Sequence, residues 1–241
     1  MTAPSAAPSD TAAVSRSPRS RPVPPHRTAL ALGLFCLLAT VALALVVHAH
    51  PERPPFQALD DCWLRWMGGP HSGVRMALAT VLNWFGGPLG VVVPAALLVF
   101  LAVRRRWWSL LCLLTSYGVG DMLVVQVLKH LVDRPRPANP LVRVDHGSFP
   151  SGHAAGTALL VVMVGALLVP APRRPMWWLG GTLFTLAMLW SRTWLRAHWL
   201  SDTLAGAMAG AGCALLLWWA FAPLLLREGD PAHRDTAAEQ P

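Results

Sequence analysis

Lysine is almost missing from this chain. Among 241 residues Lys129 is the only lysine, whereas arginine occurs 19 times. Charged residues make up only 13% of the sequence, hydrophobic residues make up 54%, and the mean hydropathy is +0.44. A soluble domain carries about 25% charged residues. The composition therefore excludes an ordinary soluble domain and indicates a membrane protein.

Two other common patterns are also missing. The four cysteines form no CxxC pair and no cluster with histidine, which argues against a disulfide framework and against a zinc site. The net charge is +8, but the basic residues are scattered between apolar runs and form no stripe with interleaved aromatic residues. Nucleic-acid binding is therefore not expected.

Six apolar runs dominate the sequence, and each is bounded by proline, glycine or charge. They predict membrane-spanning helices at 29–47, 88–103, 107–128, 154–169, 176–194 and 200–226. The fold class is therefore all-α, a six-transmembrane-helix bundle. Because a long polar leader precedes the first run, we interpret that run as an uncleaved span rather than a signal peptide.

The remaining segments complete the expected organisation. Residues 28–226 form the membrane domain, while 1–27 and 227–241 are predicted to be disordered tails. The spacing in 74–85 predicts an interfacial helix that leads into the second span through Gly86 and Gly87. The loop at 48–73, with Phe56, Trp63 and Trp66, suggests an interfacial lid.

Arginine clusters predict the orientation in the cell membrane. Arg104–Arg106 and the Arg173-Arg174 pair lie in very short hairpins, where the positive-inside rule has most force. Both termini are therefore expected in the cytoplasm. The loops that contain 48–73, 129–153 and 191–199 are then expected on the outer, extracytoplasmic face.

Two features of the spans need a packing partner. Gly206 and Gly210 in the last span form a GxxxG pattern, which allows another helix to approach closely. Asp121 lies inside the third span, and an intramembrane carboxylate needs a partner. The sequence does not identify that partner.

Three polar segments meet on the outer face in this arrangement. They read KHLVDRPRP at 129–137, PSGH at 150–153 and SRTWLRAHWLSD at 191–202. Lys129, Arg136 and Arg192 supply a point charge and two planar forks suited to phosphate oxygens. Ser151 adds a hydroxyl donor, and Gly152 opens a helix whose free N–H groups favour an anion. The predicted ligand is an oxyanion.

Two histidines complete the predicted chemistry. His198 and Asp202 are four residues apart, so on a helix the carboxylate could hold one ring nitrogen protonated. This arrangement suits His198 as the nucleophile. His153, from a different helix, is placed to protonate a leaving oxygen. The active site is therefore expected at one membrane face.

The three segments resemble the signature of the type 2 phosphatidic acid phosphatase superfamily, which includes membrane lipid phosphatases, soluble acid phosphatases and vanadium haloperoxidases. The resemblance covers about residues 28–226, with every signature position matched in 129–202. It implies that Lys129, Arg136, Ser151, Gly152 and Arg192 hold the phosphoryl group. It further implies that His198 forms a phosphohistidine, that Asp202 orients it and that His153 protonates the leaving group, with no metal and no cofactor.

The predicted function is an integral membrane, metal-independent phosphatase of lipid phosphates or diphosphates. Candidate substrates are phosphatidic acid, phosphatidylglycerol phosphate and isoprenoid diphosphates; the sequence leaves both the substrate and the oligomeric state open. Binding or transport of a lipid phosphate without turnover is one alternative, and vanadate-dependent halide oxidation is another. Arg134, Arg143 and Arg196 lie outside the signature and are expected either to widen the positive funnel or to meet anionic headgroups.

Overall fold

The computed structural model describes residues 27–229, and these residues form helices without any β-strand. The elements are α1 (Arg27–Ala49), α2 (Gln57–Trp66), α3 (Gly73–Gly86), α4 (Pro88–Val103), α5 (Trp107–Ser116), the π-helix η1 (Tyr117–Val125), α6 (Gln126–Val132), α7 (Gly152–Leu167), the 3₁₀ turn η2 (Ala171–Arg173), α8 (Arg174–Trp194) and α9 (Leu200–Gly229). The all-α prediction is confirmed. Apart from the helical residues 27 and 227–229, the two predicted tails lie outside the described residues.

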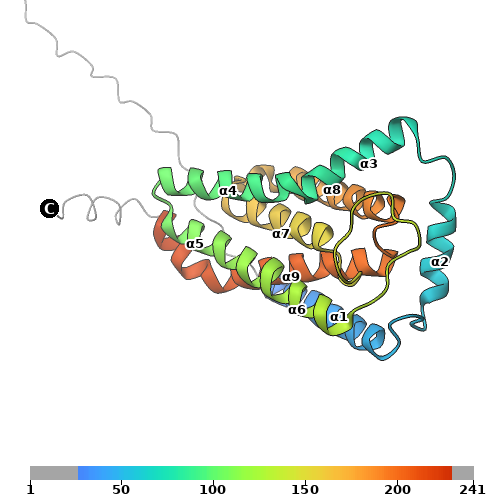
Figure 1. Cartoon of the computed structure of the whole chain (residues 1–241). Helices are drawn as coiled ribbons and strands as arrows, with labels where there is room; N and C mark the ends of the chain where they lie inside the picture. The colour runs from blue at the N-terminus through green and yellow to red at the C-terminus, as the bar shows by residue number, and fades with distance from the viewer. Residues whose placement is uncertain (1–26, 230–241) are drawn as a thin grey trace, which may run out of the picture.

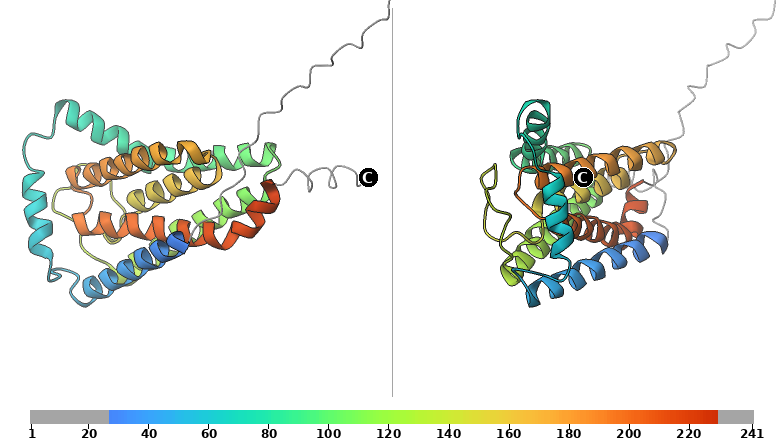
Figure 2. Two further views of the ribbon diagram at one scale, coloured as in Figure 1. Left: turned by 180° about the vertical axis from the view of Figure 1, so that it is seen from behind. Right: turned by 90° about the vertical axis from the view of Figure 1, so that its right-hand side faces the viewer.

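The long helices run side by side, and α2 crosses one end of the bundle (Figure 1). Helix α7 contacts α3, α4, α5, η1, α8 and α9, so it lies at the centre. Its residues Leu159, Val162 and Met163 are buried in the main hydrophobic core. Figure 2 shows the same arrangement from behind and from the α2 end.

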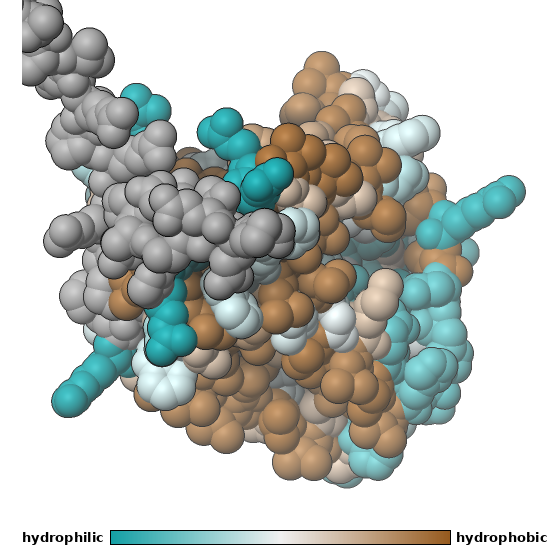
Figure 3. All heavy atoms as spheres, turned by 90° about the vertical axis from the view of Figure 1, so that its left-hand side faces the viewer, coloured by the Kyte–Doolittle hydropathy of each residue, from teal (hydrophilic) through white to brown (hydrophobic). Residues whose placement is uncertain are grey.

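The outer surface of the bundle is apolar. Phe35 and Leu38 of α1, for example, are 66% and 68% exposed, and hydrophobic side chains cover much of the described surface seen in Figure 3. Large exposed apolar surfaces are unfavourable in water, because apolar groups are driven out of contact with it. The surface therefore faces lipid.

Length and composition mark three helical stretches as able to cross a membrane: Arg27–Ala49, Trp107–Val132 and Leu200–Glu228. Helices α3 and α4 form a fourth candidate if they are counted as one span, bent by 46°. Helix α7 is apolar but shorter, at 16 residues. The described residues thus support three or four spans, and the count of six stays a prediction.

Small residues let α9 pack closely against its neighbours, as the GxxxG pattern predicts. A methyl group on Gly206 would overlap the Ser151 carbonyl oxygen, and one on Gly210 would overlap the Ala155 carbonyl oxygen. The backbones of α7 and α9 therefore touch at these glycines. This contact fixes the start of α7, where the PSGH segment lies, relative to the start of α9.

Three local features refine the prediction. The helix expected at 74–85 exists as α3, its interfacial position stays a prediction, and the chain bends between α3 and α4 at Gly86 and Gly87. The π-helix η1 interrupts the predicted third span and carries Asp121. The segment predicted as a loop at 48–73 contains α2, which we did not expect from the sequence.

Candidate active site

A pocket of about 180 Å³ opens between α3–α4 and η1–α6, with α7 beside both. Five of the predicted site residues line it: Lys129, Gly152, His153, Arg192 and His198. Apolar side chains also line it, among them Leu89, Val93, Leu160 and Phe184. The pocket is therefore lined by both cationic and hydrophobic groups. Asp121 also lines it, together with Tyr117 and Gln126.

His198 lies in the turn between α8 and α9, not on a helix as predicted. The chain reverses there because the N–H groups of Ala197 and His198 both donate to the Arg192 carbonyl oxygen, at 3.0 and 3.3 Å. Arg196 in this turn has a left-handed backbone, with φ of 53°. The turn places the His198 ring at the pocket with only 3% of the residue exposed.

The partners of His198 define its tautomer. Nδ1 lies 2.7 Å from the Ser148 carbonyl oxygen, which can only accept, so Nδ1 carries the proton. Nε2 lies 3.2 Å from Nη1 of Arg136, which can only donate, so Nε2 presents its lone pair. The ring is therefore held with the Nε2 lone pair available, as the predicted nucleophilic role requires.

Burial and positive charge keep His198 neutral. Burial disfavours the charged imidazolium, and the cations of Arg192, Arg136 and Lys129 add repulsion, so the pKa of His198 lies well below 6.5. The hydrogen bond to Ser148 opposes this shift but does not outweigh it. A neutral imidazole is the form that a nucleophilic role requires.

Asp202 does not bond directly to His198, which corrects our expectation. Its Oδ2 atom lies 3.9 Å from Nδ1 of His198, beyond hydrogen-bond distance. Because His198 precedes α9, the i,i+4 geometry of a helix does not apply. Oδ2 instead accepts from the Ser148 hydroxyl at 2.5 Å and from the Trp199 N–H at 3.0 Å. Asp202 therefore positions Ser148, and the Ser148 carbonyl oxygen positions the His198 ring.

Arg136 and Lys129 are joined by a carboxylate that the sequence analysis missed. Oδ2 of Asp145 lies 2.9 Å from Nζ of Lys129, and Oδ1 lies 2.5 Å from Nη2 of Arg136. Burial raises the pKa of Asp145, but the hydrogen bond and charge of Lys129 and the charge of Arg136 outweigh it and lower the pKa overall. A single acidic residue in a loop gives no sequence signal. A carboxylate nevertheless binds the same Lys and Arg donors that bind a phosphoryl group.

Two buried donors of the predicted site have no hydrogen-bond partner among the described residues, and one of them belongs to Arg192, which lines the pocket. The Nε atom of Arg192 and the Oγ atom of Ser151 make no hydrogen bond within residues 27–229. Arg192 is anchored through Nη1, which donates to the side-chain oxygen of Asn83 in α3. Buried donors are costly when unpaired, so both are suited to receive an anion.

His153 lies in the first turn of α7 and faces the bend between α3 and α4. A methyl group on Gly86 would overlap the His153 ring. The bend therefore needs a glycine for the ring to fit. His153 and His198 line the same pocket from two different segments, as the sequence predicts.

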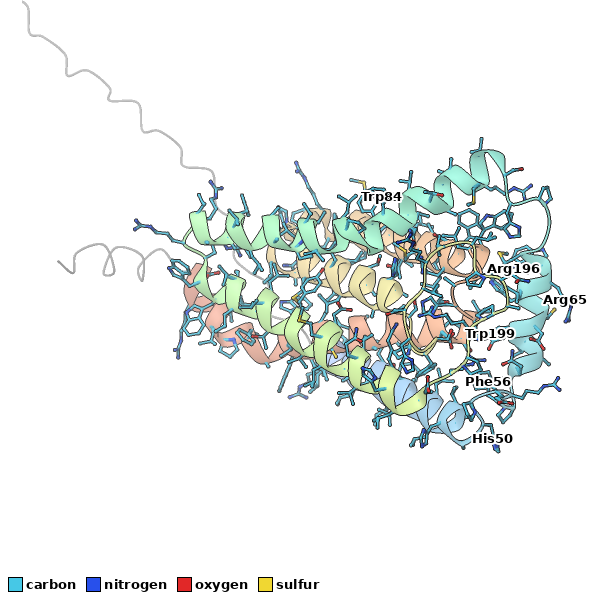
Figure 4. The ribbon with its side chains drawn as sticks, viewed as in Figure 1. His50, Phe56, Arg65, Trp84, Arg196 and Trp199 are labelled. Atoms are coloured by element: carbon cyan, nitrogen blue, oxygen red, sulfur yellow. The ribbon has the colours of Figure 1, made fainter. Side chains whose placement is uncertain are left out.

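The three arginines outside the signature have different surroundings. Arg143 lines the pocket. Arg196 lies at the α2 end of the molecule, near Trp199 (Figure 4), beside a second, shallow hollow. Arg134 is 1% exposed and bonds Asp202 and Asp60. The expected funnel role is therefore wrong for Arg134.

Comparison with known proteins identifies the family of the chain. The PAP2 superfamily model matches residues 106–224. Phosphatidylglycerophosphatase B of Bacillus subtilis (strain 168) is 30% identical over 192 residues, which cover 75% of this chain and 88% of the relative. The chain belongs to the PAP2 superfamily. The predicted family resemblance is confirmed.

A solved PAP2 structure has the same fold. The crystal structure of the transmembrane PAP2 type phosphatidylglycerolphosphate phosphatase from Bacillus subtilis superposes with a TM-score of 0.60 at 27% identity. The match covers 78% of this chain and 93% of that one. The chain is therefore a membrane lipid phosphatase of PAP2 type, a metal-independent phosphatase, as its sequence predicts.

Proposed function

We propose that this PAP2 phosphatase removes the terminal phosphate of phosphatidylglycerophosphate through a phosphohistidine on His198. The observation that supports the proposal is the pocket itself, which is lined by Lys129, His153, Arg192 and His198 and also by apolar side chains such as Leu160 and Phe184. A lipid phosphomonoester has the same two parts, an anion and a hydrophobic body. The curated Bacillus subtilis relative and the solved Bacillus subtilis structure both bear that substrate in their names.

Binding begins with an exchange of anions. The phosphoryl oxygens replace the Asp145 carboxylate on Lys129 and Arg136, and they take up the free Nε of Arg192. The Ser151 hydroxyl and the start of α7 at Gly152 complete the donor set. These donors are already in place, so they stabilise the charge that develops in the transition state.

The reaction then proceeds in two displacements. Burial and the charge of Arg192 lower the pKa of His153 to about 3, so His153 carries a proton only when the bound phosphoryl anion lies beside it and offsets these effects. Nε2 of His198 attacks phosphorus, the bond to the lipid oxygen breaks, and protonated His153 donates its proton to that oxygen. Neutral His153 next takes a proton from water, whose oxygen attacks phosphorus and releases His198 and inorganic phosphate. Asp202 acts on His198 through Ser148 during both steps.

The proposed topology follows the arginine clusters. Six spans, with both termini in the cytoplasm, put the pocket on the extracytoplasmic side of the cell membrane. The substrate would then bind from the outer leaflet. Cysteine labelling of Cys62 in intact cells, with the other three cysteines replaced, tests this side.

Phosphate release from detergent-solubilised protein tests the proposed function. We expect turnover of phosphatidylglycerophosphate in micelles by the wild type and loss of turnover in His198→Ala. Phosphatidic acid and an isoprenoid diphosphate, assayed beside it, rank the substrates by kcat/KM. Equal rates for His198→Ala and wild type would remove catalysis at this residue, and rates no higher than the protein-free background in both would leave binding without turnover.

A further inference from the structure

A buried ion-pair network connects α2 to the nucleophilic histidine. Arg134 lies between two carboxylates, with Nη1 2.6 Å from Asp202 Oδ1 and Nη2 2.9 Å from Asp60 Oδ2. The exposed fractions of the three side chains are 0%, 0% and 2%. The Phe56 and Trp199 rings lie 6.0 and 5.3 Å from the guanidinium and exclude water from it.

Asp60 also fixes the start of α9. It accepts hydrogen bonds from the N–H and the hydroxyl of Ser201, at 2.9 and 2.6 Å. The Arg134 fork in turn donates to the Ser201 hydroxyl and to the Gln57 side-chain oxygen, at 2.8 and 2.6 Å. Helix α2 is therefore bonded to Ser201, the residue that precedes Asp202.

The network reaches His198 in two further bonds. Because Arg134 occupies Oδ1 of Asp202, Oδ2 remains for the Ser148 hydroxyl. The Ser148 carbonyl then holds Nδ1 of His198. The Ser148 N–H donates to the Arg134 carbonyl oxygen at 2.8 Å, so Arg134 holds Ser148 from both sides.

We propose that Asp60 and Arg134 are positioning residues, which set the orientation and the charge environment of the nucleophilic His198 through Asp202 and Ser148. Neither residue lines the pocket. The lid function expected for 48–73 is replaced by this one, since the residues that line the pocket come from other segments. The proposal rests on the proposed function, because it assigns a role within that reaction.

Changing the charge of Arg134 or Asp60 tests the proposal through the protonation of His198, which a loss of stability alone would not alter. The charged groups that act on His198 are Arg192 of α8, Arg136 of the loop, Lys129 of α6 and Asp202 of α9, and Asp60 and Arg134 modify the last of them. Arg134→Gln removes a buried positive charge, which favours protonation of His198. Asp60→Asn removes a buried negative charge, which disfavours it.

The experiment compares kcat, KM and the pH dependence of kcat/KM for both variants in detergent micelles. We expect kcat to fall about 10-fold or more in each, because the ring is misplaced, while KM changes little. The fall of kcat/KM at low pH, which follows protonation of His198 and is called the acid limb, should move to higher pH in Arg134→Gln and to lower pH in Asp60→Asn. Glu52→Gln, which removes an exposed carboxylate from the same outer segment, should leave all three quantities unchanged.

A purely structural brace predicts a different result. Lower thermal stability with wild-type kcat and an unmoved acid limb would overturn the proposal. If the two variants do not fold, Arg134→Lys and Asp60→Glu keep both charges and should lower kcat without moving the limb; wild-type kcat in both would overturn it equally. Wild-type protein that releases no phosphate would instead overturn the proposed function.

Discussion

The Nε2 atom of His198 lies 3.2 Å from the Nη1 atom of Arg136. The same guanidinium nitrogen donates to the Ala197 carbonyl oxygen at 2.6 Å, so the backbone of the His198 turn and the ring share one donor. A phosphoryl group that approaches Nε2 must therefore also meet Arg136. In the proposed reaction, this contact would bring the nucleophile and a positive charge to the same phosphorus.

Arg136→Lys should separate charge from geometry. A lysine ammonium keeps the positive charge but lacks the planar guanidinium. It therefore cannot donate at once to the Ala197 and Gly147 carbonyl oxygens and to the phosphoryl oxygens. We expect kcat/KM for phosphatidylglycerophosphate to fall by about 10²-fold, comparable to the loss of one transition-state donor. Arg65→Lys, on the exposed side of α2, is the matched control and should retain activity. A loss below threefold in Arg136→Lys would contradict the role of the fork.

The acid limb of kcat/KM should lie below pH 6.5. Activity needs neutral His198, and its pKa is lowered by burial and by the nearby arginines. Neutral His198 therefore persists as the pH falls past 6.5 and is lost only at the lowered pKa. The limb of kcat should lie at higher pH, since a bound phosphoryl anion neutralises the cations. Steady-state rates from about pH 4 to 8 test both limbs, and a kcat/KM limb at or above 6.5 would be inconsistent with the buried ring.

Asp145→Asn should strengthen anion binding. The carboxylate competes with phosphate for Lys129 and Arg136, and an amide competes less because it carries no charge. We expect inhibition constants for orthovanadate and inorganic phosphate to fall about 3- to 10-fold, as for the loss of about 1 kcal/mol of competing ion pairing. Asp133→Asn, an exposed acid in the same loop that pairs with His146, provides the control. Unchanged or weaker vanadate inhibition in Asp145→Asn would show that the carboxylate does not compete.

Gly86→Ala should impair protonation of the leaving group. The added methyl overlaps the His153 ring, which must move. We expect kcat to fall about 10-fold or more while vanadate still binds, because the phosphoryl donors are untouched. Gly180→Ala adds the same methyl to a helix where no atom lies within 4 Å, and it should be neutral or slightly stabilising. Wild-type kcat in Gly86→Ala would mean that His153 tolerates displacement.

The sequence predicts the helices and the residues of the site better than their connections. Apolar runs reveal the spans because lipid contact requires them, and the three motifs are recognisable because phosphate chemistry needs particular groups. Helix α2 is short and amphipathic, so no long apolar run announces it. Its contact between Asp60 and Arg134 joins residues far apart in the chain, which no local pattern encodes.

The partner of Nδ1 of His198 was predictable only in part. The spacing of His198 and Asp202 suggests a direct hydrogen bond if both lie on one helix. His198 instead lies in the turn that follows Arg196, and its Nδ1 atom is 3.9 Å from Asp202. A backbone carbonyl carries no sequence signature, so Ser148 could not be identified as the acceptor. The π-helix at Asp121 escapes detection for a related reason, since its apolar pattern differs little from that of an α-helix.

The mixed lining of the pocket has a consequence for the products of the proposed reaction. Lys129, Arg143 and Asp145 line the same space as Leu89 and Leu160. Inorganic phosphate is soluble in water, whereas the chains of a dephosphorylated lipid favour apolar surroundings and the bilayer. Under the proposed function, the two products would therefore leave toward different solvents.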